Sequence, residues 1–231
     1  MKYYWIVWVC LCPLIVQSQD ANDFLSQGVA KVQLGNYSGA VQDFTRAAQL
    51  SREIAPMAYY NRGSAKAKLG QHRSAISDYN TALRSEPNKA VLYHHRALSY
   101  MQLNDFGNAT GDLSLALSIN SSIPDAYYNR AVCKFKTGNH YGSIDDFNRA
   151  ISYGSNVAQA YHYKGMVHIR YQAYSEAIEA FTMAITYNPS HATAYQNRGG
   201  ARVKMKNFSG ALSDCNQAVA LNPNLTAVYL N

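Results

Sequence analysis

The sequence repeats itself with a period of 34 residues. The stretch AYYNRGSAKAKLG from Ala58 returns as AYYNRAVCKFKTG from Ala126 and as AYQNRGGARVKMK from Ala194, with weaker copies from Ala90 and Ala158. Repeat units therefore start near residues 21, 56, 90, 124, 158, 192 and 226. A fixed period in this range indicates a solenoid, in which each unit buries its apolar face by stacking on its neighbours.

The pattern within one unit predicts two antiparallel helices. In the unit that starts at residue 56, Tyr59 and Gly63 lie at helical spacing, and Gly70 then breaks the helix. Tyr79 belongs to a second helix, which Pro87 ends because proline cannot continue it. Small residues at the facing positions allow the two helices to approach closely. The whole chain is therefore predicted to be all-α.

These positions resemble the tetratricopeptide repeat. Counted from each unit start, position 4 is aromatic, position 8 is Gly or Ala, position 24 is mostly aromatic and position 27 is Ala. The resemblance covers residues 21 to 231 and implies an α-solenoid of about six full repeats plus a partial seventh. The sequence departs from the family at position 11, where the family often has Tyr and only Tyr100 fits.

Residues 1–18 have the pattern of a signal peptide. Lys2 is followed by a charge-free, largely apolar run from Tyr3 to Val16, and VQSQD offers a cleavage site after Ser18. This run is too short for a comfortable membrane span. An uncleaved anchor and a buried first helix are the alternatives. We expect an exported protein, periplasmic, cell-envelope or secreted, whose mature repeat array covers residues 19–231.

Two charged positions recur that helix packing does not require. Position 7 is Arg in four units, where the family commonly has Leu, and position 23 is Asp in those same units. Acidic residues are sparse, 14 in 231, so their recurrence at one position is not chance. We interpret these residues as structural ion pairs between helices, with a role in binding as the alternative. The residues are Arg62, Asp78, Arg96, Asp112, Arg130, Asp146, Arg198 and Asp214.

The resemblance also implies a binding groove. In this family the first helices line a concave surface, which positions 2, 5, 6, 9, 12 and 13 face. Asn at position 6 suits the backbone amides of an extended peptide, and Lys or Arg suits a carboxylate. The family's clamp for a C-terminal carboxylate transfers here only in its Asn, so no full clamp is predicted. A solvated polar face is the alternative interpretation. The candidate peptide-binding residues are Tyr60, Asn61, Lys68, His94, His95, Tyr128, Asn129, Lys136, His162, Arg170, Asn197 and Lys204.

Other kinds of site are not predicted. His94 and His95 are adjacent and point apart on a helix, and no pair of histidines has the spacing of a helical zinc site. No catalytic arrangement and no Gly-rich phosphate loop is visible, so we predict neither an enzyme nor a cofactor, metal or small-molecule substrate. A net charge of +7 suggests acidic partners, but without a basic run we predict no nucleic acid. Cys133 and Cys215 are expected to be small buried residues two repeats apart rather than a disulfide.

The predicted function is an exported interaction module or scaffold that binds an extended, partly acidic peptide or partner protein. The alternative is the accessory region of a larger exported enzyme or envelope-biogenesis factor. The sequence ends six residues into the seventh unit, where Tyr229 has no second helix to pack on. We therefore expect an uncapped apolar edge at Val228, Tyr229 and Leu230, and self-association through it.

Overall fold

The computed structural model describes residues 20–224, which consist of helices and turns without a strand. The predicted signal peptide and the partial seventh repeat, with Val228, Tyr229 and Leu230, lie outside this range. The chain forms two compact halves, divided after Ser121. These halves are called the first and the second unit, and a single 34-residue period is called a repeat. The first holds a helix over 20–33, α2 (Tyr37–Leu50), α3 (Ala55–Lys68), α4 (His72–Ser85), α5 (Ala90–Gln102) and α6 (Phe106–Ile119). The second holds α7 (Pro124–Lys136), α8 (His140–Ser152), α9 (Val157–Arg170), α10 (Tyr174–Tyr187), α11 (Ala192–Lys204) and α12 (Phe208–Leu221).

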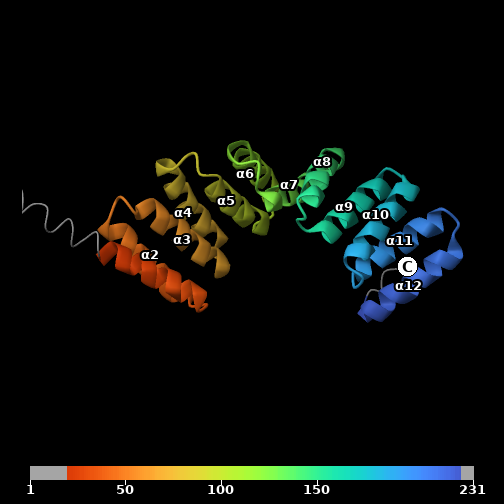
Figure 1. Cartoon of the computed structure of the whole chain (residues 1–231), viewed down its shortest axis with the longest axis horizontal. Helices are drawn as coiled ribbons and strands as arrows, with labels where there is room; N and C mark the ends of the chain where they lie inside the picture. The colour runs from red at the N-terminus through yellow and green to blue at the C-terminus, as the bar shows by residue number, and fades with distance from the viewer. Residues whose placement is uncertain (1–19, 225–231) are drawn as a thin grey trace, which may run out of the picture. The chain divides into compact units, whose positions relative to one another are not determined.

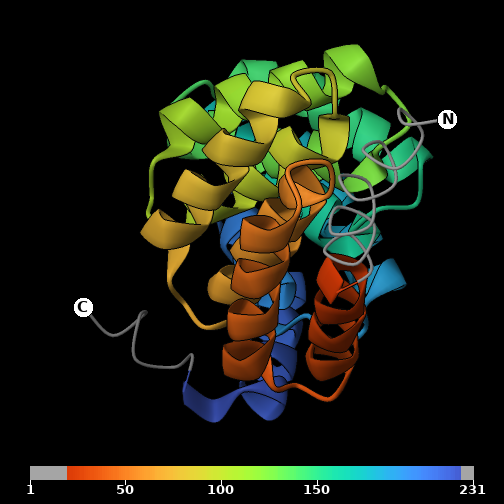
Figure 2. The same ribbon diagram turned by 90° about the vertical axis from the view of Figure 1, so that its left-hand side faces the viewer.

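Each unit is built from helix pairs that follow the 34-residue period. In the first unit α3 packs on α4 and α5 on α6, and in the second α7 packs on α8, α9 on α10 and α11 on α12. Figure 2 turns the first unit toward the viewer and shows its helices lying side by side. Within each unit, a second helix also packs on the first helix of the next repeat, as α4 does on α5. This arrangement confirms the all-α solenoid predicted from the period.

The turn inside each repeat recurs with the same geometry. Position 15 has a positive φ in every repeat, with Gly in three repeats, as at Gly70 (φ 76°), and a larger residue in the others, as at Gln172 (φ 59°). The amide of Gln71 donates to the carbonyl of Lys66 at 2.9 Å, which satisfies a carbonyl left open at the helix end. Several second helices then begin at a polar residue whose side chain accepts from a backbone amide of the first turn. These caps are Asn36, Asp105, Asn139 and Asn207.

The core of most pairs places a glycine or alanine at position 8 against a large side chain at position 24. A Cβ added at Gly63 would lie 2.8 Å from the buried ring of Tyr79, and one at Gly165 would lie 2.5 Å from the ring of Phe181. Either contact is too close for a methyl group, so in these two repeats glycine at position 8 sets the distance between the helices. At Gly199, opposite Cys215, the nearest atom is 3.3 Å away, because the cysteine leaves more room.

The two cysteines differ in their surroundings. Cys133 is buried in α7 as expected, whereas Cys215 on α12 is only partly buried, so the expectation of two buried thiols is wrong for Cys215. Within residues 20–224 no further helix packs over α12. No disulfide joins the two residues.

Candidate functional site

The position-7 arginines make paired contacts with the position-23 aspartates of their own repeats. Arg62 donates from Nε to Asp78 Oδ2 at 2.9 Å and from Nη2 to Oδ1 at 2.6 Å. The carboxylates are buried, and the hydrogen bond to Asp78 raises the pKa of Arg62 above its ordinary value. Each arginine also lies over the tyrosine one turn before it, as Arg62 does over Tyr59 at 4.9 Å. The same pairing joins Arg96 to Asp112, Arg130 to Asp146 and Arg198 to Asp214.

Three of these arginines, Arg62, Arg96 and Arg198, also reach back to the preceding repeat. Nη1 of Arg62 donates to Thr45 Oγ1 at 3.0 Å, and Nη1 of Arg96 donates to Asn80 Oδ1 at 2.6 Å. Both acceptors stand at position 25 of the second helix before, so one guanidinium connects three helices. The sequence analysis did not predict that these arginines join neighbouring repeats. The feature that could have indicated it is the recurrence of small polar residues at position 25.

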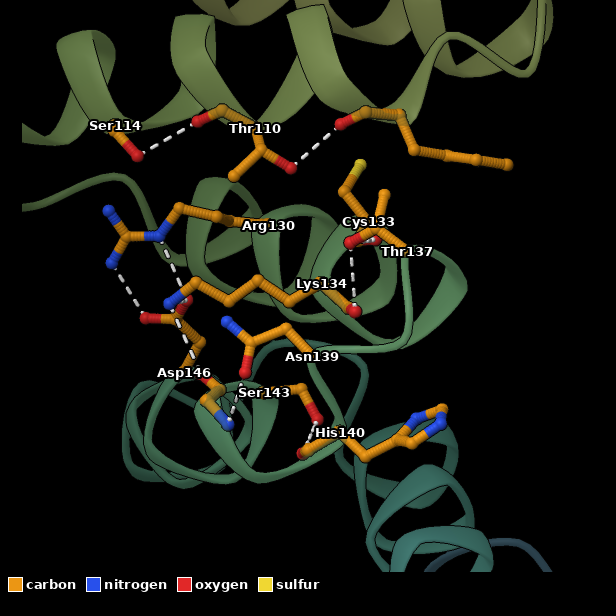
Figure 3. A network of polar contacts seen from close by, with 12 residues as sticks. Thr110, Ser114, Arg130, Cys133, Lys134, Thr137, Asn139, His140, Ser143 and Asp146 are labelled. Carbon is orange, nitrogen blue, oxygen red and sulfur yellow. Dashed lines mark hydrogen bonds and ion pairs between the residues drawn. The ribbon is translucent and has the colours of Figure 1, made fainter.

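A second cation completes the pair in several repeats. Lys134 Nζ lies 2.8 Å from Asp146 Oδ2, so the buried carboxylate is shared with Arg130, and Figure 3 shows both cations turned toward it. Lys66 and Arg202 stand at the same position 11 and contact Asp78 and Asp214. This contact explains why basic residues replace the family's Tyr at position 11.

The fifth repeat, which starts near residue 158, lacks the carboxylate at position 23. Lys164 holds position 7 and Ala180 holds position 23, and the ammonium of Lys164 donates to Asn148 of the preceding repeat at 2.7 Å. Burial lowers the pKa of Lys164. The contact between repeats is kept here by a single flexible side chain, whereas the bridge within the repeat is absent.

Two candidate groove positions contact each other across neighbouring repeats. Tyr60, at position 5, places its hydroxyl 3.2 Å from Nε2 of His95, at position 6 of the next repeat. His162 and Asn197 hold the same two positions, and the side-chain nitrogen of Asn197 lies 2.9 Å from His162 Nε2. Position 6 therefore also serves packing between repeats, and Asn197 already uses one of its amide donors inside the protein.

Burial shifts the pKa values of several of these candidate groove residues. It lowers the pKa of His95 to about 4, with help from the nearby charges of His94 and Lys68. It also lowers the pKa of His162 to about 4, with a contribution from His191, whose ring centroid is 4.8 Å away. Burial raises the pKa of Tyr128 to about 12. Both low-pKa histidines are neutral near pH 7 and present hydrogen-bonding groups rather than charge.

The basic candidates are exposed at the ends of the first helices, whereas the polar candidates are partly buried. A cation in the last turn of a helix is stabilised by the helix dipole, which gives these residues a structural role besides any binding. The exposed group is Lys68, Lys136, Arg170 and Lys204, and the partly buried group includes Asn61, His94 and Asn129.

In each unit a cavity lies between successive first helices, at equivalent repeat positions. In the first unit it has a volume of about 560 Å³ between α3 and α5, and its lining includes Lys68, His95 and Ser99. In the second unit the cavity is about 310 Å³, between α9 and α11, and its lining includes Asn197 and Lys204. Sequence analysis identified the rims of these cavities but missed their floors. Ser99 was visible as a hydroxyl at position 10, where most repeats carry Ala, Val or Cys.

Within residues 20–224, no group of three or more His, Cys, Asp or Glu side chains is placed to hold a metal ion. None of the helices in that range is long and apolar enough to cross a membrane.

Comparison with known proteins agrees with this architecture. The chain is 23% identical to MamA in a crystal structure, with a TM-score of 0.69 over 78% of this chain and 98% of that one. It is 21% identical to YrrB, described as a TPR protein with an unusual peptide-binding site, with a TM-score of 0.69 over 79% and 94%. A tetratricopeptide repeat protein from Parabacteroides merdae is 18% identical, with a TM-score of 0.74 over 87% and 80%.

The comparison with curated proteins returns no match. One tetratricopeptide repeat model matches residues 25–90 and 164–225, and a second matches residues 124–153. The first model alone covers more than half of the chain, which therefore belongs to the tetratricopeptide repeat family.

Proposed function

We propose that the protein is a non-catalytic interaction module that binds extended, partly acidic segments of partner proteins along its first helices. The observation that carries the proposal is the cavity found between successive first helices in each unit, with an exposed lysine on its lining. YrrB, of similar fold, is described as having a peptide-binding site. A concave site with a few polar groups and cations is suited to a peptide rather than to a flat surface.

The charges along the first helices favour the binding of acidic segments. Lys68 and Lys204 are exposed on the cavity linings, and neither cavity is lined by Asp or Glu. The buried aspartates are already neutralised by arginine and lysine. The first-helix ends thus carry positive charge that no neighbouring carboxylate of these cavities offsets.

Charge reversal at Lys68 tests the proposal in the first unit. Against a set of short peptides graded in Asp and Glu content, Lys68→Glu should weaken binding of the acidic peptides about three- to tenfold, the size of one lost and one repulsive exposed charge contact. Isothermal titration at two salt concentrations is the measurement, and binding to the parent protein should weaken with salt because exposed charges are screened.

Arg84→Glu is the matched control. Arg84 is exposed in the last turn of α4, a second helix, and the same charge change there should leave the affinity unaltered. Equal losses for both variants would show that net charge alone attracts the peptides. Loss with Arg84→Glu alone would place binding on the second helices and refute the proposal.

The proposal includes export and self-association. Export rests on the signal-like pattern of residues 1–18, and N-terminal sequencing of the protein recovered from the producing cell should find a start near residue 19. Self-association is supported by Phe208 and Leu212 on α12, which are 65% and 64% exposed. Sedimentation should then show a concentration-dependent mass that Leu212→Lys lowers. A protein that keeps its full-length N-terminus would refute export. A monomer mass that does not change with concentration would refute self-association.

A further inference from the structure

Two buried polar atoms without a hydrogen-bond partner line the same cavity of the first unit. They are Oγ of Ser99, a residue that is 1% exposed, and Nδ1 of His72, the first residue of α4. A buried polar group left without a partner destabilises the fold, so such groups are rare and call for an explanation. Their coincidence in one cavity suggests that a ligand supplies the missing partners.

The rest of the cavity lining combines apolar surface with a charged group at the rim. Ala67, Leu98 and the ring of Tyr79 supply apolar surface, and the Tyr79 hydroxyl donates to Ser64 Oγ at 3.3 Å. Lys68 is exposed, so its ammonium remains in solvent at the cavity rim. The site is therefore suited to a side chain with an apolar stem and a polar end group.

We propose that this cavity is the subsite for the carboxamide side chain of a glutamine or asparagine in the bound segment, which rests on the function proposed above. A carboxamide carries one acceptor oxygen and two N–H donors. The Ser99 hydroxyl donates to the carboxamide oxygen, and His72 Nδ1 accepts from the amide nitrogen when the ring proton is on Nε2. Both open groups are satisfied by one ligand group.

A carboxylate fits this lining less well. Its charge would lose hydration on entering the cavity, and such a loss is offset only where a cation is close. The lining holds one ammonium, that of the exposed Lys68, whereas the buried groups are a hydroxyl and an imidazole nitrogen. The acidic residues of a bound segment are thus assigned to the rim and a neutral side chain to the interior.

The second unit provides an internal comparison. Its cavity occupies the same repeat positions, but Tyr174 replaces His72 and Ala201 replaces Ser99. Met166 and Ile169 contribute further apolar surface. These replacements show that the fold accepts Ala at position 10 and Tyr at position 17, so Ser99→Ala and His72→Tyr are variants expected to fold.

The test uses three small probes with the full chain, namely the N-acetyl methylamides of glutamine, glutamate and alanine. Binding is followed by NMR through the imidazole nitrogens of His72 and His95. The glutamine probe should shift the His72 signals saturably, and its affinity should exceed those of the glutamate and alanine probes about three- to tenfold. Ser99→Ala should remove this preference by the same factor, which is the size of one lost neutral hydrogen bond. His72→Tyr, read through His95, should do likewise.

Every other result overturns the assignment. Equal binding of the alanine probe would mean that backbone amides are recognised, and tighter binding of the glutamate probe would make the cavity a carboxylate site. No binding of any probe would mean that the cavity holds solvent only. Failure of the proposed function is separate, because acidic peptides that ignore Lys68→Glu would refute it while the glutamine preference stood. Normal peptide binding without that preference would remove the subsite alone.

Discussion

Replacing Asp146 with alanine should lower the free energy of unfolding by about 3 kcal/mol, the cost of removing one partner from a buried ion pair. The Asp146 side chain is 4% exposed and contacts two cations, Arg130 and Lys134. Its loss leaves both charges side by side without a counterion, with Arg130 still packed over Tyr127. Urea unfolding followed by circular dichroism measures the change.

The neighbouring residue is the control. Asp145 lies on the same helix and is exposed, so Asp145→Ala removes the same charge from the surface and should change stability by less than about 0.5 kcal/mol. Asp112→Ala should fall between the two, because Asp112 pairs with Arg96 and its position-11 neighbour is Tyr100 rather than a cation. A near-zero effect for Asp146→Ala would show that solvent already screens the pair.

Acidification should destabilise the protein through His95 and His162. Each has a folded-state pKa of about 4, against 6.5 for the unfolded chain. Between these pH values the unfolded chain binds a proton that the folded chain does not. The contribution of each neutral histidine to the free energy of unfolding is therefore fully present above about pH 6.5 and is lost as the pH drops to about 4. At about 1.4 kcal/mol per pKa unit, each histidine contributes up to about 3 kcal/mol of this loss.

Substitutions taken from other repeats isolate this effect. Position 6 is Asn in several repeats and position 5 is Tyr in two, so His95→Asn and His162→Tyr should fold while removing the titrating rings. Lys68 and His94 remain beside the first site and His191 beside the second. Aspartates titrate in both proteins, so the readout is the difference between the two pH profiles. Parallel profiles between pH 4 and 6.5 would show that the histidines do not carry the acid sensitivity.

The sequence predicts contacts within a repeat better than contacts between repeats. The pairing of position 7 with position 23 followed from two residue columns, because the two helices of a hairpin have a fixed relation. The reach of Arg62 to Thr45 depends on how one hairpin stacks on the next, which the repeat pattern does not determine. The lysines at position 11 were likewise compared with the family's Tyr rather than matched to Asp146 and its equivalents.

The cavities and the cysteines show a second limit. A cavity arises where side chains leave space, and the repeat pattern reports which residues are present rather than the volume between them. Ser99 and His72 therefore entered no sequence-based site, although both line the larger cavity. Cys215 was assigned to a buried column, but burial at position 24 depends on what covers α12 as well as on its own repeat.

The missing carboxylate of repeat five affects how the second unit loses structure. In a linear array, stability is a sum of terms within repeats and terms between neighbours, and an arginine that bridges both couples the two terms. At Lys164 this coupling is reduced to one bond to Asn148, whereas Arg198 keeps contacts to Thr182 and Asp214. Opening of the second unit should therefore begin between α9 and α10, where the bridge within the repeat is absent. Amide hydrogens there would exchange through a sub-global opening, while α11 and α12, still joined by Arg198 and Asp214, would open together as one cooperative segment.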